Sequence, residues 1–482
     1  MRSIAELAER VRSGSVSAEE IARQSLANIA AKRGLNAFLH VSEETTLERA
    51  REIDERRKRG EELGALAGVP IAVKDALCTL DAPTTCASEI LGGWRPPYDA
   101  TVVARLRVAD ALLVGKTNMD ELAMGSSNEN SAFGPVKNPW DPTRIPGGSS
   151  GGSAVAVAAG LAEGALGSDT GGSIRQPAAL TGTVGIKPSY GRVSRYGLVA
   201  FASSLDQVGP FARDVRSAAR LLGVIAGHDA RDSTSMDREV PDYEAACERE
   251  PRGLRLGVPE DYFGEGLDPE VASAVRAAIA QLEQDGMRVV PIAMPYTRHG
   301  VATYYVLATA EASSNLARFD GVRFGLRHEA PGCDLGGMIE ATRSAGFGRE
   351  VKRRILLGTY VLSAGYYEAY YQKAQRVRSL IRRDFEQAFE RVDVIATPTS
   401  PTTAFALGAR VDDPLAMYLA DVYTLPASLA GVAALSLPVG LSAARLPIGL
   451  QLIAPAFAEE RLLSVAAAAE RTSPFAGARP PS

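Results

Sequence analysis

The pattern of polar and apolar positions changes near residue 65. The pattern before residue 65 predicts helices. Ser3 with Glu6, and Ser17 with Glu20, each fit the S-x-x-E pattern of a capping box, in which a side chain satisfies a free N–H group at a helix start. The stretch 43–59 is densely charged with few apolar residues, which predicts a helix with a solvated face.

From residue 68 onward, short apolar runs bounded by glycine and proline predict buried strands, separated by helical segments. We expect strands at 68–75, 110–116, 164–168, 254–259, 392–398, 435–440 and 448–453. Between them, a loop at 147–152 leads into a small-residue helix at 153–162, and a loop at 169–173 leads into a short helix at 174–180. Strands that alternate with helices predict an α/β fold, with a central mixed sheet covered by helices on both faces.

No Pro/Gly-rich linker or internal repeat divides the chain, so we expect one large domain over 1–470. It would comprise N-terminal helices (1–60), a core rich in glycine motifs (65–210), a mostly helical region (265–390) and late strands that complete the sheet (390–470). The last residues, 471–482, have the composition of a frayed tail.

Composition excludes several classes of protein. The 482 residues are 46% apolar and 23% charged, which is ordinary for a globular enzyme and argues against disorder. With 53 basic and 57 acidic residues, the net charge of −4 gives no sign of a nucleic-acid-binding surface, so any RNA would be held mainly by a partner. The four cysteines include no C-x-x-C pair, which disfavours a disulfide framework and a zinc site.

The N-terminal segment is charged and is not a signal peptide. The most apolar stretch, 154–162, is far shorter than the roughly 20 residues of a spanning helix. We therefore expect a cytoplasmic protein without membrane contact.

Lys74 ends the predicted strand 68–75. A lysine at a strand end usually extends into water. A buried lysine, however, loses its charge readily, and its neutral amine is a usable general base.

The loop Pro146-Gly-Gly-Ser-Ser-Gly-Gly-Ser153 is the first of two glycine clusters. A phosphate-binding loop would require Gly-x4-Gly-Lys-[Ser/Thr], and no lysine stands at that position. What remains is a loop in which glycine allows close backbone approach, presenting hydroxyls at Ser149 and Ser150.

The second cluster, Gly167-Ser-Asp-Thr-Gly-Gly-Ser-Ile-Arg-Gln-Pro177, places two glycines just before Ser173. Successive N–H groups before a nucleophile can point inward and stabilise the oxyanion of a tetrahedral intermediate. Asp169 and Arg175 flank the turn, and we expect them to fix it with an ion pair rather than to react.

A serine nucleophile needs a base. The four histidines, His40, His228, His299 and His328, stand in no distinctive context, and the G-x-S-x-G elbow is missing around Ser173. A Ser–Lys arrangement is a known alternative to the Ser–His–Asp triad.

GGSSGGS at 147–153, SDTGGSIRQPA at 168–178 and VPIAVKD at 69–75 resemble the amidase signature family. The resemblance implies that Ser173 is the acyl-enzyme nucleophile and that Lys74 is the base. Ser149, which would follow a cis peptide bond, would bridge these two residues. It also implies that the N–H groups of Thr170, Gly171, Gly172 and Ser173 form the oxyanion hole, with Ser150 as a supporting neighbour. The implied fold is that of the family, and no metal or cofactor is implied in this chain.

Longer strings at 116–141, 310–325, 350–378 and 418–438 are more similar to family members that serve as the glutaminase component of a tRNA-dependent amidotransferase. This resemblance implies that glutamine hydrolysis supplies ammonia for the conversion of Glu-tRNA(Gln) or Asp-tRNA(Asn). The partners would be a B subunit, which holds most of the tRNA and uses ATP and Mg²⁺, and a C subunit. For the glutamine α-amino group and α-carboxylate, the resemblance implies Asp421 and Arg354, with Arg353 as a contender.

Two alternatives remain. A stand-alone amidase of small amides would use the same three residues without partners. A non-catalytic scaffold subunit is disfavoured because Lys74, Ser149 and Ser173 are all present.

Overall fold

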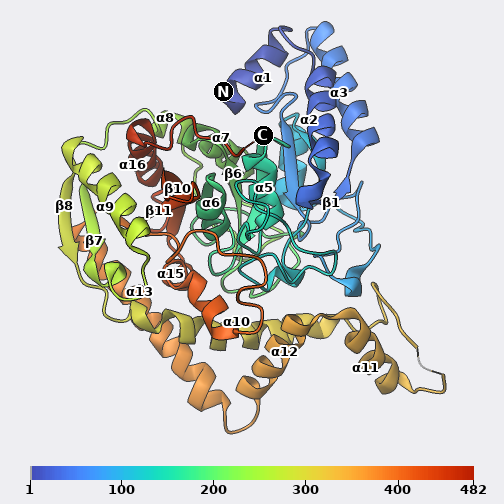
Figure 1. Ribbon diagram of the computed structural model, residues 1–482. Coiled ribbons are helices and arrows are strands. Elements are labelled where there is room, and N and C mark those ends of the chain that lie inside the picture. The colour runs from blue at the N-terminus through green and yellow to red at the C-terminus, as the bar shows by residue number, and fades with distance from the viewer. Residues whose placement is uncertain (1–2, 330, 482) are drawn as a thin grey trace.

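The computed structural model describes residues 3–329 and 331–481, and its centre is one mixed sheet of 11 strands (Figure 1). The strand order is β1-β3-β2-β4-β6-β5-β10-β11-β9-β7-β8. The pairs that β2 forms with β3 and β4, and that β7 forms with β8 and β9, are parallel, and the others are antiparallel. The strands are β1 (Phe38–Val41), β2 (Pro70–Lys74), β3 (Leu112–Thr117), β4 (Gly164–Asp169), β5 (Val184–Lys187), β6 (Gln207–Ala212), β7 (Arg255–Pro259), β8 (Arg288–Ile292), β9 (Val394–Pro398), β10 (Ala433–Leu441) and β11 (Pro447–Ala454).

Helices cover both faces of this sheet, so the predicted α/β class is confirmed. They are α1 (Ile4–Arg12), α2 (Ala18–Ala31), α3 (Glu43–Lys58), α4 (Thr101–Val108), α5 (Gly151–Ala158), α6 (Arg175–Thr181), α7 (Val215–Ile225), α8 (Tyr243–Ala246), α9 (Pro269–Gln284), α10 (Gly300–Asn315), α11 (Leu335–Gly346), α12 (Arg349–Leu362), α13 (Lys373–Arg391), α14 (Pro414–Tyr418), α15 (Leu425–Ala430) and α16 (Glu459–Thr472). A π-helix, η7 (Tyr367–Gln372), precedes α13, and a 3-10 turn, η8 (Leu419–Asp421), follows α14. In the described part of the chain, every helix is too short or too polar to span a membrane.

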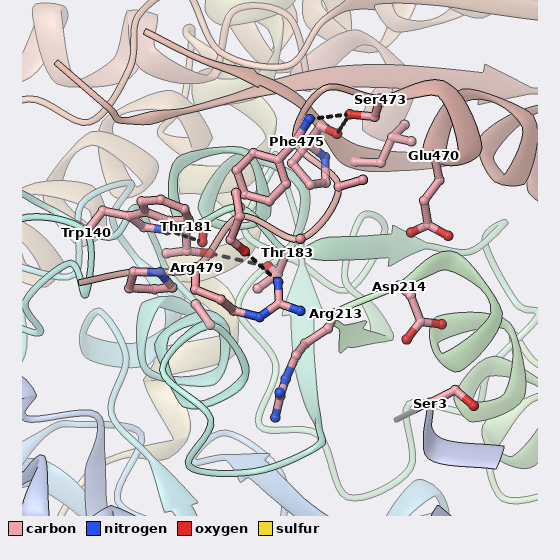
Figure 2. Close-up of a pocket in the computed structure, with 18 of the residues that line it drawn as sticks. Ser3, Trp140, Thr181, Thr183, Arg213, Asp214, Glu470, Ser473, Phe475 and Arg479 are labelled. Carbon is pink, nitrogen blue, oxygen red and sulfur yellow. Dashed lines mark hydrogen bonds between the residues drawn. The ribbon is translucent and has the colours of Figure 1, made fainter. Parts of the chain in front are cut away.

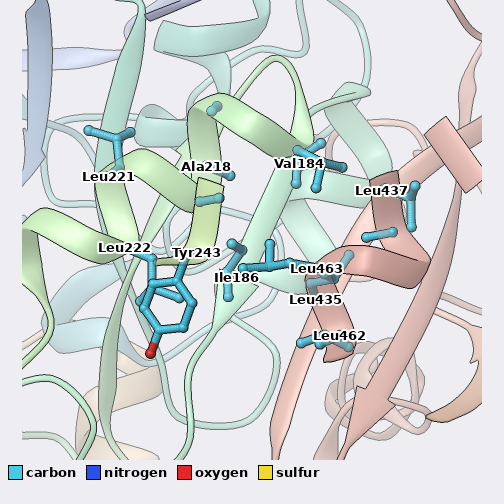
Figure 3. Packing of buried hydrophobic residues seen from close by; sticks show 14 of the residues in the cluster. Val184, Ile186, Ala218, Leu221, Leu222, Tyr243, Leu435, Leu437, Leu462 and Leu463 are labelled. Atoms are coloured by element: carbon cyan, nitrogen blue, oxygen red, sulfur yellow. The ribbon is translucent and has the colours of Figure 1, made fainter. Parts of the chain in front are cut away.

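Two large apolar clusters lie on opposite faces of the sheet. Leu435 and Leu437 of β10 join a cluster with side chains of α7 and α16 (Figure 3). Ala434, next to Leu435 in sequence, joins a second cluster with side chains of α10, α13 and α15. Neighbouring residues of a strand point to opposite faces, so a strand buried on both sides is apolar throughout.

The N-terminal helices form as predicted. The Ser3 hydroxyl accepts from the Glu6 N–H (3.2 Å), and the Glu6 carboxylate accepts from the Ser3 N–H (2.9 Å), which completes a capping box. The Ser17 hydroxyl caps α2 by accepting from the Glu20 N–H (3.0 Å).

Four strands were not predicted, namely β1, β5, β6 and β8. Two of them contain an internal proline, at Pro210 and Pro291, which in a sequence argues against a strand. The other two have only four residues each.

The expectation of a frayed tail over 471–482 is wrong for its first part. Helix α16 continues to Thr472, and Phe475 is only 7% exposed. Its ring lies 5.6 Å from that of Trp140, centroid to centroid, beside a cavity of about 310 Å³ that Thr181 and Thr183 also line (Figure 2). Phe475 joins one apolar cluster with Trp140 and Leu446, and burial of its ring anchors a segment whose composition is otherwise that of a loop.

Candidate active site

The segments that carry the predicted reacting residues lie at the carboxyl ends of two neighbouring parallel strands. Lys74 is the last residue of β2, and β4, which carries Ser168, pairs with β2. Ser149 precedes α5, and Ser173 precedes α6. In open α/β sheets, this edge is where ligands bind, because the loops that leave the strands converge there.

Lys74 is fully buried, and its amine contacts hydroxyl groups instead of carboxylates. Its Nζ lies 2.7 Å from Ser149 Oγ, 2.8 Å from Ser150 Oγ and 3.0 Å from Ser168 Oγ. It forms no ion pair with any residue in 3–329 or 331–481. Burial disfavours the ammonium and lowers the pKa of Lys74 from 10.5 to about 7, against the weaker opposing effect of distant aspartates.

The hydrogen-bond partners of the Lys74 amine determine which of them can donate to it. The Ser150 hydroxyl donates to the Ser168 carbonyl (3.0 Å), so towards Lys74 it can act only as an acceptor. A neutral amine has two N–H donors and one lone pair. When Ser150 and Ser168 accept the two N–H groups, the lone pair is left for the hydroxyl proton of Ser149.

Ser149 and Ser173 belong to loops that are joined by the backbone. The Gly148–Ser149 peptide bond is cis, as the family resemblance implied. The Ser150 N–H donates to the Ser173 carbonyl (3.2 Å), and Ser173 is 7% exposed. All four histidines lie in the described part of the chain, and none of them forms a hydrogen bond with either serine.

The turn from Thr170 to Ser173 leaves four successive N–H groups without a partner among residues 3–329 and 331–481. The turn is held by other atoms: the Gln176 N–H donates to the Gly172 carbonyl (2.8 Å), and the Thr170 hydroxyl donates to Asp206 (2.6 Å). Glycine is required at 172, because a Cβ there would lie 2.3 Å from Thr424 Oγ1. Unpaired N–H groups beside a nucleophile are suited to stabilise an oxyanion.

Asp169 and Arg175 form the predicted ion pair, with both side chains fully buried. The Arg175 Nη2 and Nε groups donate to the two Asp169 oxygens at 2.9 and 3.0 Å. The Arg175 Nη1 group also donates to the Thr424 carbonyl (2.8 Å). The pair therefore fixes the turn and ties it to the segment that follows η8.

Asp421, at the end of η8, lies against this turn. A Cβ on Gly172 would be 3.1 Å from Asp421 Oδ1. The Asp421 Oδ2 atom accepts from the Ser126 hydroxyl, whereas Oδ1 is buried without a partner in the described residues. Burial raises the pKa of Asp421 to about 7, although the Ser126 hydrogen bond opposes the shift. An unpartnered buried carboxylate oxygen is suited to bind a cation.

Arg354 and Arg353 are distinguished by their surroundings. Arg354 is 3% exposed, and its guanidinium lies 5.3 Å from the ring centre of Tyr305 and 5.5 Å from that of Tyr418. Its Nε donates to Glu350 (2.8 Å), and its terminal Nη groups donate to no residue that the structure describes. The Arg353 side chain is 29% exposed and also pairs with Glu350.

Sequence reasoning missed four contributors to this site, namely Ser168, Ser126, Tyr305 and Tyr418. Ser168 stands within the second glycine cluster at the end of the predicted strand 164–168, and this position was a usable signal. Ser126, Tyr305 and Tyr418 lie far from both clusters in sequence, so only the fold brings them to Asp421 and Arg354.

Comparison with known proteins identifies the family of this chain. A family model described as Amidase matches residues 20–463. The chain belongs to the amidase signature family. A relative from Moorella thermoacetica, named as the A subunit of glutamyl-tRNA(Gln) amidotransferase, is 58% identical over 476 residues, which cover 98% of this chain and 97% of the relative.

Two solved structures show how widely this amidase fold is shared. The structure of the glutamyl-tRNA(Gln) amidotransferase A subunit from Thermotoga maritima is similar with a TM-score of 0.80 and 44% identity, over 95% of this chain and 92% of that one. The structure of a 6-aminohexanoate cyclic dimer hydrolase is similar with a TM-score of 0.86 and 28% identity, over 99% and 98%. The amidase fold thus occurs both in a protein named as one component of an amidotransferase and in a protein named as a hydrolase.

Proposed function

We propose that this amidase hydrolyses the carboxamide of glutamine and supplies the ammonia to partner subunits, which convert Glu-tRNA(Gln) to Gln-tRNA(Gln), Asp-tRNA(Asn) to Asn-tRNA(Asn), or both. The observation that carries the chemistry is the buried amine of Lys74, which touches three hydroxyls and no carboxylate. The 58% identity to a protein named as part of an amidotransferase supports the choice of substrate.

In the proposed reaction, Ser173 Oγ attacks the carboxamide carbon of glutamine. The Ser149 hydroxyl passes its proton to neutral Lys74 and takes up the proton of Ser173. The N–H groups of Thr170, Gly171, Gly172 and Ser173 hold the negative oxygen of the tetrahedral intermediate. Lys74 then returns its proton through Ser149 to the leaving nitrogen, and ammonia departs. Water hydrolyses the acyl-enzyme to glutamate by the same relay in reverse.

Glutamine itself presents an α-ammonium and an α-carboxylate. In our proposal, Asp421 Oδ1 accepts from the α-ammonium, and the free Nη groups of Arg354 grip the α-carboxylate, a geometry to which a planar guanidinium is suited. Arg353 is the weaker contender, because its side chain is 29% exposed, whereas that of Arg354 is 3% exposed.

The amidation step requires activation of the tRNA-bound carboxylate. We assign ATP, Mg²⁺ and most of the tRNA to the B subunit, with a C subunit completing the assembly, and we expect this assembly to work in the cytoplasm, where charged tRNA is present. The net charge of −4 supports a division in which this chain is not the main RNA-binding component.

The test is a glutaminase assay that compares Ser173→Ala with Ser464→Ala. Ser464 is also buried, at 4% exposed against 7% for Ser173, but it lies on α16 and its hydroxyl donates to the Arg461 carbonyl (3.0 Å). We expect Ser173→Ala to abolish glutamine hydrolysis and Ser464→Ala to preserve it, with both variants folded by circular dichroism. Turnover in Ser173→Ala would refute the assignment of the nucleophile. A wild type that turns over simple amides but not glutamine, with or without partners, would favour a stand-alone amidase.

A further inference from the structure

Asp120 is a fully buried carboxylate in a turn over residues 120–130, which we call the Asp120 turn. Its two oxygens accept backbone N–H groups of the same turn, from Asn128 (2.9 Å) and Asn130 (3.2 Å). It forms no ion pair with any residue in 3–329 or 331–481. A buried carboxylate that no cation neutralises, close to reacting groups, is a candidate for a functional role.

Two contacts connect Asp120 to the loop that carries Ser149. The Asp120 N–H donates to the Ser149 carbonyl (3.1 Å). The carboxylate packs directly on Gly148, where a Cβ would lie only 2.0 Å from Asp120 Oδ2. Ser149 Oγ lies 2.7 Å from Lys74 Nζ, so a movement of the Ser149 backbone changes the distance over which the proton passes in the proposed relay.

Gln176, a residue of α6, connects the same two segments a second time. Its Oε1 atom accepts from the Gly148 N–H (3.1 Å), and its Nε2 group donates to the Ser126 carbonyl (2.8 Å). The loop before Ser149 is therefore held by Gln176 and by Asp120 together, and the position of this loop depends on the shape of the Asp120 turn.

The backbone of the Asp120 turn needs support from outside. Three of its non-glycine residues have a positive φ of 51 to 66°, namely Leu122, Ala123 and Asn128. Such a conformation persists only where the surrounding contacts determine it. The turn closes around the Asp120 carboxylate, because a Cβ on Gly125 would lie 2.3 Å from Asp120 Oδ1. The carboxylate and its two N–H donors thus fix the turn from its centre.

Asp120 is ionised at neutral pH in spite of its burial. Burial raises the pKa of Asp120 to about 6, and the two N–H donors and the charges of Lys74 and Arg354 oppose this rise. At pH 7, about nine molecules in ten would then carry the negative charge.

This charge acts on Lys74. Burial lowers the pKa of Lys74, and among the groups that oppose this effect Asp120 acts most strongly, ahead of Asp169, Asp206 and Cys86. Asp169 is already neutralised by its own ion pair. When the amine takes up a proton, the charge of Asp120 therefore favours the ammonium that forms.

We propose that Asp120 is a positioning residue of the proton relay, which holds the Ser149 loop against Lys74 and favours the ammonium that forms there. The proposal rests on the proposed function for the direction of proton transfer. In this role Asp120 exchanges no proton with the substrate. The proton passes between Ser149 and Lys74, and Asp120 sets the distance and the charge that govern this step.

The test is kcat at saturating substrate from pH 5.5 to 10 for the wild type, Asp120→Asn and Asp54→Asn, with glutamine and with butyramide. Asp54 is the matched control. It is a buried carboxylate on α3 that accepts the backbone N–H groups of Ala18 (2.9 Å) and Glu19 (3.1 Å) at the start of α2. Both substitutions remove a carboxylate that accepts two backbone N–H groups, but only Asp120 contacts the Ser149 loop.

We expect Asp120→Asn to lower the plateau of the profile about tenfold or more with both substrates, because a small displacement of a reacting group costs up to about 100-fold. Loss of the negative charge should also lower the pKa of Lys74, so the midpoint of the profile should move to lower pH, by about one pH unit. Asp54→Asn should match the wild type in plateau and midpoint. The loss on butyramide distinguishes this role from that of Asp421, because butyramide has no α-ammonium group.

An unchanged midpoint in Asp120→Asn would overturn the proposal, because a residue that supports only the fold would lower the plateau without moving the profile. An unchanged plateau would also overturn it, since Ser149 would then be placed without Asp120. Should Asp120→Asn not fold by circular dichroism, Asp120→Ser replaces it with the same expected shift, because its hydroxyl still accepts one N–H of the turn. A wild type that hydrolyses butyramide but not glutamine overturns the proposed function, and the butyramide profiles then still decide the role of Asp120.

Discussion

The pH dependence of glutamine hydrolysis should report the titration of Lys74. Its pKa is lowered from 10.5 to about 7 by burial, and the base in our proposal is the neutral amine. At pH 7, about half of the molecules would then hold a neutral lysine, against about one in 3,000 for a lysine with an ordinary pKa. The rate should therefore fall about tenfold per pH unit below 6 and level off above 8.

Ser168→Asp perturbs this titration directly. Ser168 Oγ lies 3.0 Å from Lys74 Nζ, so a carboxylate there would stabilise the ammonium. At an effective dielectric constant of about 20, two charges about 4 Å apart interact by about 4 kcal/mol, and each pKa unit corresponds to about 1.4 kcal/mol. After allowance for the desolvation of the new carboxylate, we expect the pKa of Lys74 to rise by about 2 units and the rate at pH 7 to be about 50-fold lower, recovered in part near pH 9.

The assay is kcat at saturating glutamine from pH 5.5 to 10, measured on the wild type, Ser168→Asp and Ser168→Asn, because kcat/KM would also report the free carboxyl of Asp421, whose pKa is raised to about 7. The asparagine variant has nearly the same shape as the aspartate variant but no charge, and its midpoint should stay near that of the wild type. A flat wild-type profile between pH 6 and 8 would contradict the role of Lys74 as the base. Equal midpoints in the aspartate and asparagine variants would do the same.

The remaining predictions concern stability, substrate binding and the tail. Lys74→Met should abolish activity yet stabilise the fold near pH 7. A lysine whose pKa is depressed in the folded state destabilises that state below pH 10.5, by up to about 5 kcal/mol at pH 7. Chemical denaturation should therefore show that the stability advantage of the variant shrinks between pH 7 and 10. Asp421→Asn should raise KM for glutamine about tenfold or more and spare simple amides, and equal losses on both would make Asp421 structural. Arg354→Met should behave likewise, with the loss again confined to substrates that carry an α-carboxylate. Phe475→Ala should lower the free energy of unfolding by about 2 kcal/mol, because the ring packs on Trp140, and an unchanged denaturation midpoint would show that the tail contributes nothing.

The sequence alone determined the features that depend on local pattern. The sequence showed the buried strands that carry Lys74 and Ser168, the helix caps at Ser3 and Ser17, and the two glycine clusters. Apolar runs, capping boxes and glycine doublets each act over only a few residues. The Asp169–Arg175 pair was readable for the same reason, since both residues flank one turn.

Only the tertiary structure decided what lies beyond that range. The pairing of β2 with β4 brings Ser168 onto Lys74, and packing of α10 and α12 places Tyr305 beside Arg354. Which of Arg353 and Arg354 is the more buried also depends on packing, because adjacent helical residues point in different directions. The depressed pKa of Lys74 has the same origin: it is a property of the low-dielectric surroundings that distant segments create together, and no stretch of sequence contains it.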